Sequence, residues 1–410
     1  MPVTLKDIQR AAALLGGEIS NTRCYCSEKL TALTGAKVFL KLENLQFTGS
    51  FKERGALVKL VSLSKRDRKR GVIAMSAGNH AQAVAYRSRK LNIPATIVMP
   101  RYTPNIKVEH TRGFGAEVIL YGEVLSEAAD HAKHLAQERN LTLIHPYDDD
   151  KIIAGQGTIA LEMLTRQPDL EVLIIPVGGG GLISGIAVAA HAINPDVEIV
   201  GVQTNRFPAM KQALAGEPIH CGRLSIAEGI AVKTPGEKTL PIIRKRVSDI
   251  LLVDEPEIET AVRILLDMEK TVVEGAGAAG LAALLKHRKR FSNRKVGLVL
   301  SGGNIDPLVL TCLDHQTRTG SLGPNGSASC GRKGCSRRTG RGLPVHWRSR
   351  RQDRRSAPPA LFYQPAAPIG RSRIYFDHPR HRPCRPDPLR VVSRRIQDAL
   401  DGHIQTTRHG

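Results

Sequence analysis

The chain has 410 residues, 41% of them apolar, which suffices for large buried cores and predicts one large two-lobed protein or two to three domains. Its net charge of +22 is uneven: residues 311–410 hold 20 Lys and Arg against 6 Asp, and the first 310 residues, with 40 basic and 32 acidic side chains, carry only +8. Seven scattered cysteines without a C-x-x-C pair argue against a zinc ribbon or thioredoxin motif, and the start of the chain lacks a signal-peptide core, so we expect a cytoplasmic protein.

An alternation of strands and helices is predicted from about residue 37 to residue 300, after an amphipathic N-terminal helix. Because helices lie between consecutive strands, the fold class is α/β, with parallel sheets flanked by helices. The uncharged segment 172–193 is not interpreted as a membrane span, because Pro176 and four glycines interrupt it. The strand candidates are 38–42, 72–75, 95–99, 117–120, 172–177, 199–203, 250–253 and 296–300.

Lys52 stands at the junction between an extended segment and a helix-compatible run, 51–60. Small residues precede it, so its amine can reach into a cleft and form an imine with a carbonyl cofactor. Taken alone, a solvated surface lysine is the ordinary alternative.

A second polar segment, Ser76 to His80, lies between the strand 72–75 and a helix predicted over 81–91. Backbone N–H groups and short polar side chains at the start of a helix suit a carboxylate. The alternative is an ordinary helix cap made by Ser76 or Asn79, with a structural His80.

Two glycine-containing turns follow strands further along the chain. Gly178 to Gly181 separate the strand 172–177 from a helix, and such a turn can bind phosphate through converging N–H groups; it is neither G-x-G-x-x-G nor a P-loop. Ser301 and two glycines follow the strand 296–300, which places a hydroxyl at the ligand-binding edge of an α/β sheet. Plain turns are the alternative at both places.

Together, these segments resemble the threonine dehydratase (threonine ammonia-lyase) and serine racemase group of fold-type II pyridoxal-phosphate enzymes. The resemblance spans about residues 1–311 and implies a two-lobed, tryptophan synthase β-like fold, with a large lobe of 1–47 plus 151–312 and a small lobe of 48–150. Its motifs are SFKERGA, SAGNHAQ, GGGGL, EGIAVKTPG, VVEGAGA and SGGNID.

The resemblance also implies site residues. Lys52 would hold pyridoxal 5'-phosphate covalently and shuttle the Cα proton. The substrate carboxylate would meet Ser76, Ala77, Gly78, Asn79 and His80. The remaining cofactor contacts would be Phe51 beside the ring, Asn79 at the ring hydroxyl, Gly178, Gly179, Gly180, Gly181 and the Leu182 amide at the phosphate, and Ser301 at the pyridine nitrogen.

Ser301 indicates the type of reaction. A hydroxyl is too weak an acid to keep the pyridine nitrogen protonated, which disfavours a long-lived carbanion and suits β-elimination. We therefore expect a lyase that converts L-threonine to 2-oxobutanoate, or L-serine to pyruvate, with release of ammonia. The cofactor phosphate would serve as the acid, as the resemblance implies. The role, isoleucine biosynthesis or threonine catabolism, stays open.

Two departures separate this chain from the serine racemases it resembles. Ala77 stands where those racemases have a second serine, and it cannot transfer a proton. Gln203 and Ala209 replace the acidic ligands of their divalent-metal site, so we expect no such metal. A serine racemase or dehydratase remains the alternative, and a non-catalytic protein with a nucleic-acid-binding tail is a second one.

The segment 313–410 is rich in Arg, Pro, Gly and Ser and predicts a disordered tail. It stands where many relatives of this length continue into an ACT-type regulatory domain. We hypothesise a frameshift, natural or a sequencing error, near residues 307–325; a genuine basic tail that binds nucleic acid or acidic membrane is the alternative. The expected partners are an amino-acid substrate and further copies of this chain, without membrane or nucleic acid.

Overall fold

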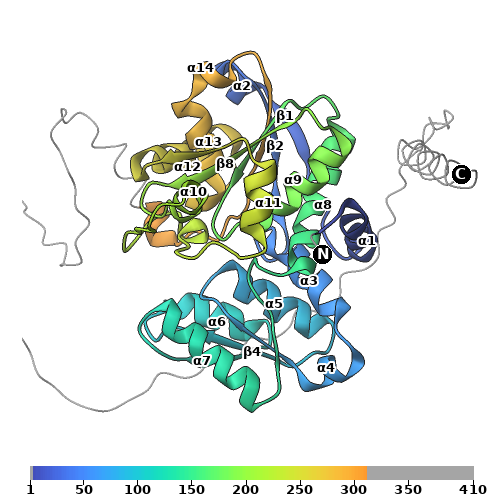
Figure 1. Ribbon diagram of the computed structural model, residues 1–410. Helices are drawn as coiled ribbons and strands as arrows, with labels where there is room; N and C mark the ends of the chain where they lie inside the picture. The colour runs from blue at the N-terminus through green and yellow to red at the C-terminus, as the bar shows by residue number, and fades with distance from the viewer. Residues whose placement is uncertain (1–2, 312–410) are drawn as a thin grey trace, which may run out of the picture. The chain divides into compact units, whose positions relative to one another are not determined.

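The structure, a computed structural model, describes residues 3–311. The predictions for the tail at 313–410 lie outside these residues. In the described part, ten strands form two sheets of six and four strands, and helices cover both sheets (Figure 1). This confirms the predicted α/β class. None of the described helices combines the length and the apolar character needed to cross a membrane.

The six-stranded sheet has the order β1-β2-β10-β7-β8-β9. Its neighbours pair in parallel from β2 to β9, as expected for strands joined by helices. At one edge of the sheet β1 runs antiparallel to β2, and the sequence did not predict this strand. The strands are β1 (Cys24–Ser27), β2 (Lys37–Lys41), β7 (Val172–Pro176), β8 (Glu198–Thr204), β9 (Asp249–Val253) and β10 (Lys295–Val299).

The four-stranded sheet has the order β5-β4-β3-β6 and is parallel throughout. Three of its strands were predicted from their apolar runs, whereas β6 was not, because only two residues pair at this edge. The strands are β3 (Val72–Met75), β4 (Ala95–Met99), β5 (Glu117–Leu120) and β6 (Thr142–Leu143).

Helices pack on both faces of the larger sheet (Figure 1). Buried Ile, Leu, Val and Ala side chains join one group of helices to one face and a second group to the other. The first group is α1 (Leu5–Leu15), α8 (Asp150–Arg166), α9 (Gly181–Ile193), α10 (Ala209–Ala215) and α11 (Thr239–Arg246). The second is α2 (Glu28–Thr34), α12 (Glu255–Glu269), α13 (Gly275–Lys286) and α14 (Arg288–Phe291).

The smaller sheet is covered in the same way, with two separate apolar clusters. One cluster contains side chains of α3, α5 and α6, and the other contains side chains of α7. Two 3-10 turns, Glu43–Leu45 and Glu228–Ile230, complete the described elements. The helices are α3 (Lys52–Ser62), α4 (Lys65–Arg70), α5 (Asn79–Lys90), α6 (Asn105–Gly113) and α7 (Leu125–Glu138).

Helix α3 contributes to the cores of both sheets. Leu57 and Val58 belong to the core of the larger sheet, and Ala56 and Leu60 to that of the smaller one. A Cβ on Gly155 of α8 would lie 2.7 Å from the Cα of Gly55 in α3, so the two helix backbones are in contact. This close packing places the first residue of α3 between the sheets with little freedom to move.

Candidate active site

The carboxyl ends of adjacent strands gather the predicted residues at one edge of the larger sheet. Strands β10 and β7 are neighbours, so the segments after them, which begin at Ser301 and Gly178, start at the same edge. The segment before α3 pairs with the residues after β10: Phe51 donates its N–H to the Ser301 carbonyl at 3.0 Å, and Ser50 bridges Gly302. The start of α3 is thereby held against the end of β10.

Lys52 is the first residue of α3 and its amine points into the protein. Its Nζ donates to the Pro146 carbonyl oxygen at 2.7 Å and lies 5.2 Å from the centre of the Phe51 ring. Burial lowers the pKa of Lys52 to about 8, although the negative charge of Glu274 opposes this shift. About a tenth of the amine is therefore unprotonated at pH 7, far more than for an ordinary lysine, and this neutral form can act as a nucleophile and a base.

The four-glycine turn leads into the N-terminus of α9. Gly180 has φ +97°, in the left-handed region, and a Cβ on Gly179 would lie 2.3 Å from the ring of Tyr147. Helix α9 begins at Gly181, so the N–H groups of its first turn have no acceptor within the helix. Together with the helix dipole, these donors suit a phosphate.

The 76–80 segment starts α5 without a capping side chain. Gly78 holds the cap position, so the alternative in which Ser76 or Asn79 caps the helix is wrong. The side chain of Asn79 instead donates to Glu274, and its carbonyl oxygen accepts from Asn304. Both contacts are long-range in sequence, which is why a local capping rule could not anticipate them.

His80 is buried, and its ring is committed to the protein interior. Nε2 lies 2.9 Å from the Ile144 carbonyl oxygen, so this nitrogen carries the hydrogen. Burial, with a further contribution from the charge of Lys52, lowers the pKa of His80 to about 3. The ring is therefore neutral and unsuited to proton transfer at physiological pH.

Two polar groups of the site were not among the predicted site residues. Glu274, just before α13, accepts from Asn79 Nδ2 at 2.8 Å, and burial raises its pKa to about 7. Asn304, after β10, donates from Nδ2 to the side-chain Oδ1 of Asn79 and to the backbone carbonyl oxygen of Thr48, each at 2.8 Å. Their only sequence signal was membership in the motifs VVEGAGA and SGGNID.

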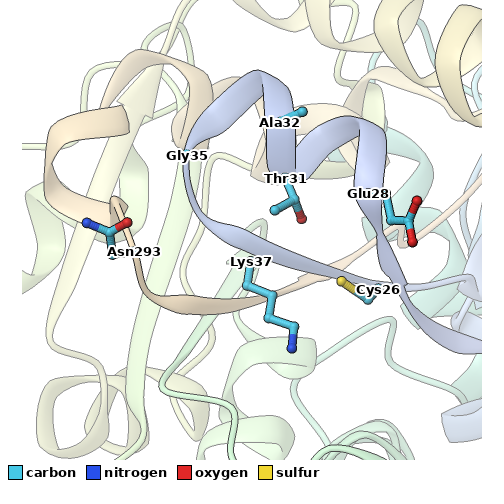
Figure 2. A pocket seen from close by; sticks show the side chains of 7 residues that line it. All are labelled: Cys26, Glu28, Thr31, Ala32, Gly35, Lys37 and Asn293. Atoms are coloured by element: carbon cyan, nitrogen blue, oxygen red, sulfur yellow. The ribbon is translucent and has the colours of Figure 1, made fainter.

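Two further positions considered in the sequence lie at and after the carboxyl end of β8, the strand next to β7. Gln203 is buried in β8, where its Oε1 accepts from the Lys211 backbone, and Ala209 opens α10. A separate surface hollow beside α2 contains none of the predicted site residues (Figure 2). It is lined by Cys26, Glu28, Thr31, Ala32, Gly35, Lys37 and Asn293.

The family model described as "Pyridoxal-phosphate dependent enzyme" matches residues 15–302. The chain belongs to this family of pyridoxal-phosphate-dependent enzymes. The chain is also 47% identical over 307 residues to an L-threonine ammonia-lyase of Thermotoga maritima, covering 74% of this chain and 76% of the relative. A catabolic L-threonine dehydratase of Staphylococcus aureus is 43% identical over 310 residues, covering 74% of this chain and 90% of the relative.

Two solved structures, a serine racemase and a threonine deaminase, are similar to this chain. The maize serine racemase has a TM-score of 0.73 at 34% identity and covers 78% of this chain and 98% of its own. The processed form of threonine deaminase isoform 2 from Solanum lycopersicum has a TM-score of 0.72 at 32% identity and covers 78% of this chain and 91% of its own. The resemblance to the threonine dehydratase and serine racemase group is thereby confirmed.

The residues at this edge fit pyridoxal phosphate. The Lys52 amine, with its lowered pKa, would suit the cofactor aldehyde. The glycine turn at the N-terminus of α9 would suit the phosphate, and the buried Ser301 hydroxyl would suit the pyridine nitrogen. The glycine turn has no room for side chains, because a Cβ on Gly179 or Gly180 would overlap Tyr147 or Thr239. The backbone itself is therefore what faces an anion there.

Proposed function

We propose that this pyridoxal-phosphate enzyme is an L-threonine ammonia-lyase that also accepts L-serine, giving 2-oxobutanoate or pyruvate and ammonia by β-elimination. The observation that carries the proposal is the buried amine of Lys52, whose lowered pKa and position between Pro146 and Phe51 suit covalent and acid–base work. The choice of substrate is supported by the relatives named as acting on L-threonine, at 43% and 47% identity.

The proposed contacts to the cofactor come from four segments. Lys52 would bind its aldehyde carbon, with Phe51 beside the ring. Asn79 would donate to the ring hydroxyl, and Ser301 would meet the pyridine nitrogen. The N–H groups of residues 178–182 would hold the phosphate. In support, residues 49–51 pair directly with 301–303. Tyr147 contacts the glycine turn and follows Pro146, whose carbonyl accepts from the Lys52 amine.

The proposed reaction needs a base at the substrate Cα and a place for the carboxylate. Pyridoxal phosphate, when bound, withdraws electrons from Cα and makes its proton acidic. The amine of Lys52 then removes that proton, since it is the buried nitrogen with a pKa near 8. The N–H groups at the start of α5, in the segment 76–80, receive the substrate carboxylate and orient Cα toward Lys52.

Ser301 supports elimination over transamination. It is 3% exposed at the end of β10, and its hydroxyl cannot hold a full proton on the pyridine nitrogen. Electron withdrawal is then weaker, so loss of the β-hydroxyl together with the Cα proton is favoured over a long-lived carbanion. The leaving hydroxyl would take its proton from the cofactor phosphate.

Serine racemisation is the second candidate, favoured by the likeness to the maize serine racemase. Racemisation needs an acid on the face of Cα opposite Lys52, and Ala77 supplies none at the position where racemases resembling this chain have a serine. A non-catalytic protein is disfavoured by the lowered pKa of Lys52, because such shifts cluster at functional sites.

The test is purification with pyridoxal phosphate, a visible absorbance scan and measurement of keto-acid release. We expect 2-oxobutanoate from L-threonine, pyruvate from L-serine and no D-serine, with Lys52→Ala losing at least about a thousandfold in rate. Lys65→Ala, a change of an exposed lysine on α4, serves as the matched control. Turnover retained by Lys52→Ala, or D-serine as the main product, would overturn the proposal.

The proposal also covers the oligomeric state, the cellular compartment and the boundaries of the two lobes. We propose a homo-oligomer in the cytoplasm, without membrane or nucleic acid as a partner, in which lobes 48–150 and 1–47 plus 151–312 meet at Lys52. Light scattering of the purified protein tests the assembly, and a monomer at micromolar concentration would contradict it. Limited proteolysis between the lobes tests their boundaries.

A further inference from the structure

The side-chain amide of Asn79 is held on both sides by other segments. Asn304, after β10, donates from Nδ2 to Asn79 Oδ1 at 2.8 Å and also to the Thr48 carbonyl oxygen at 2.8 Å. On the other side, Asn79 Nδ2 donates to Glu274 Oε1 at 2.8 Å. The contacts form a continuous relay that runs from Thr48 through Asn304 and Asn79 to Glu274.

The groups at the two ends of this relay determine which atoms donate and which accept along it. The backbone carbonyl of Thr48 can only accept, so Asn304 must face it with Nδ2. The same Nδ2 group also faces Asn79, which must therefore present Oδ1, and its own Nδ2 is left to face Glu274. Reversing the amide of Asn79 would place two NH2 groups against each other and two acceptors at Glu274.

One N–H of Asn79 remains available in this arrangement, because Nδ2 carries two hydrogens and Glu274 takes one. Resting on the proposed function, we propose that Asn304 is a positioning residue: it orients the Asn79 amide so that an N–H, and not the C=O, faces the ring oxygen of pyridoxal phosphate. Asn304 itself contacts Asn79 and the backbone, so its effect on the cofactor passes through Asn79.

The surroundings of the relay leave it little room to rearrange. Gly49 has φ +72°, and a Cβ there would lie 2.5 Å from Asn304 Oδ1. A Cβ on Gly302 would lie 2.5 Å from Glu274 Oε1 and 3.0 Å from Asn79 Nδ2. A backbone this close keeps Asn304 in place, and no second donor to Asn79 Oδ1 occurs among the described residues.

The test uses the visible absorbance of the bound cofactor, which depends on the charge of its ring oxygen and changes with pH. Pyridoxal-phosphate-loaded protein is titrated for the unsubstituted chain, Asn304→Ala, Asn79→Ala and the double variant. We expect Asn304→Ala to move the midpoint by about half to one pH unit, in the same direction as Asn79→Ala. The double variant should show no further shift, because both changes remove the same donor.

Asn44→Ala is the matched control. Its Nδ2 donates to Thr271 Oγ1 at 2.8 Å and the Val272 carbonyl at 3.0 Å, and it packs beside Gly303, but it has no hydrogen bond to Asn79. We expect its midpoint to equal that of the unsubstituted protein. If Asn304→Ala fails to fold, Asn304→Leu removes the same donors at similar volume.

Several outcomes separate this inference from the proposed function. An unchanged midpoint in Asn304→Ala, or shifts that add in the double variant, would overturn the positioning role while leaving the ammonia-lyase proposal intact. The predicted shifts without keto-acid release from L-threonine would support the positioning role and contradict the substrate. Absence of any visible cofactor band in the unsubstituted protein would overturn both.

Discussion

Two groups of buried or half-buried ionisable side chains lie around the start of α3, and they differ in whether the charges are paired. The paired cluster consists of Lys41, Glu43, Arg54 and Glu162. Arg54 Nε lies 2.8 Å from Glu43 Oε2, and its Nη1 lies 2.6 Å from Glu162 Oε1. Burial alone would raise the pKa of Glu43, but Arg54 and then Lys41 outweigh it and lower this pKa to about 2.

The second group contains Lys52, His80 and Glu274, and none of them has an oppositely charged hydrogen-bond partner within residues 3–311. Burial dominates here, so the pKa of Lys52 falls to about 8, that of His80 falls to about 3 and that of Glu274 rises to about 7. Each group shifts toward its neutral form. In the paired cluster, ion pairs keep the groups charged, whereas in the second group burial without ion pairs favours the neutral forms. Such unpaired groups are typical of functional sites, which agrees with the proposed role of Lys52.

Arg54→Met should break the paired cluster most severely. The change leaves Glu43 and Glu162 without their main partner in a buried environment, so we expect the free energy of unfolding to fall by about 3 to 5 kcal/mol. Thermal or urea unfolding of the cofactor-free protein measures this. Arg112→Met, which removes an exposed i,i+3 pair with Glu109, should change it by less than about 0.5 kcal/mol. Similar effects of the two changes would contradict the contrast.

The unpaired amine of Lys52 should make stability depend on pH in the alkaline range. Its pKa is about 8 in the folded protein and 10.5 for an ordinary lysine, so the unfolded chain binds more protons between these values. The free energy of unfolding therefore rises with pH from about 8 to 10.5, by up to about 3 kcal/mol from this residue.

Comparison with Lys52→Met isolates this contribution, since the variant lacks the titrating amine. We expect the difference in unfolding free energy between the variant and the unsubstituted, cofactor-free protein to shrink as pH rises through that range. Urea unfolding at several pH values provides the measurement, and parallel curves would show that Lys52 is not destabilised by burial.

Gly179→Ala should weaken cofactor binding at the glycine turn and leave the paired cluster unchanged. The added Cβ would lie 2.3 Å from the ring of Tyr147, so either the ring or the phosphate-binding turn must move. We expect cofactor affinity to fall by about tenfold to a hundredfold, measured by absorbance titration. Gly113→Ala has no atom within 4 Å of the new Cβ and should bind normally. Unchanged affinity in Gly179→Ala would place the phosphate elsewhere.

Glu274→Gln should produce the smallest effect, and it measures how far the charge of Glu274 raises the pKa of Lys52. The negative charge of Glu274 raises the pKa of Lys52 against the effect of burial. Its removal should shift the midpoint of cofactor capture, which requires the neutral amine, to lower pH by about half a pH unit. Stopped-flow absorbance over pH 6 to 10 measures it. An unchanged midpoint would mean that Glu274 is already neutral and acts only as a hydrogen-bond partner.

The sequence predicted the strands that are buried on both faces better than those at the edges. The apolar runs of β3, β4, β7 and β10 are unambiguous because a parallel strand covered by helices is apolar throughout. By contrast, β1 has the sequence CYCS, which carries no apolar run and pairs antiparallel at an edge. Edge pairing depends on what the neighbouring strand leaves unpaired, and a local pattern does not contain that information.

The site shows the same division. Lys52, the glycine turn and Ser301 lie at boundaries between strands and helices. The alternating sequence pattern predicts these boundaries, and in an α/β fold they line one edge of a sheet. Only the tertiary structure determined that Asn79 does not cap α5, and that Glu274 and Asn304 hold its amide from 195 and 225 residues away. Likewise, the pKa values of Lys52 and Glu274 arise from burial among groups distant in sequence. Local sequence thus determines where functional groups stand on the elements, whereas long-range packing decides their partners, their orientation and their charge.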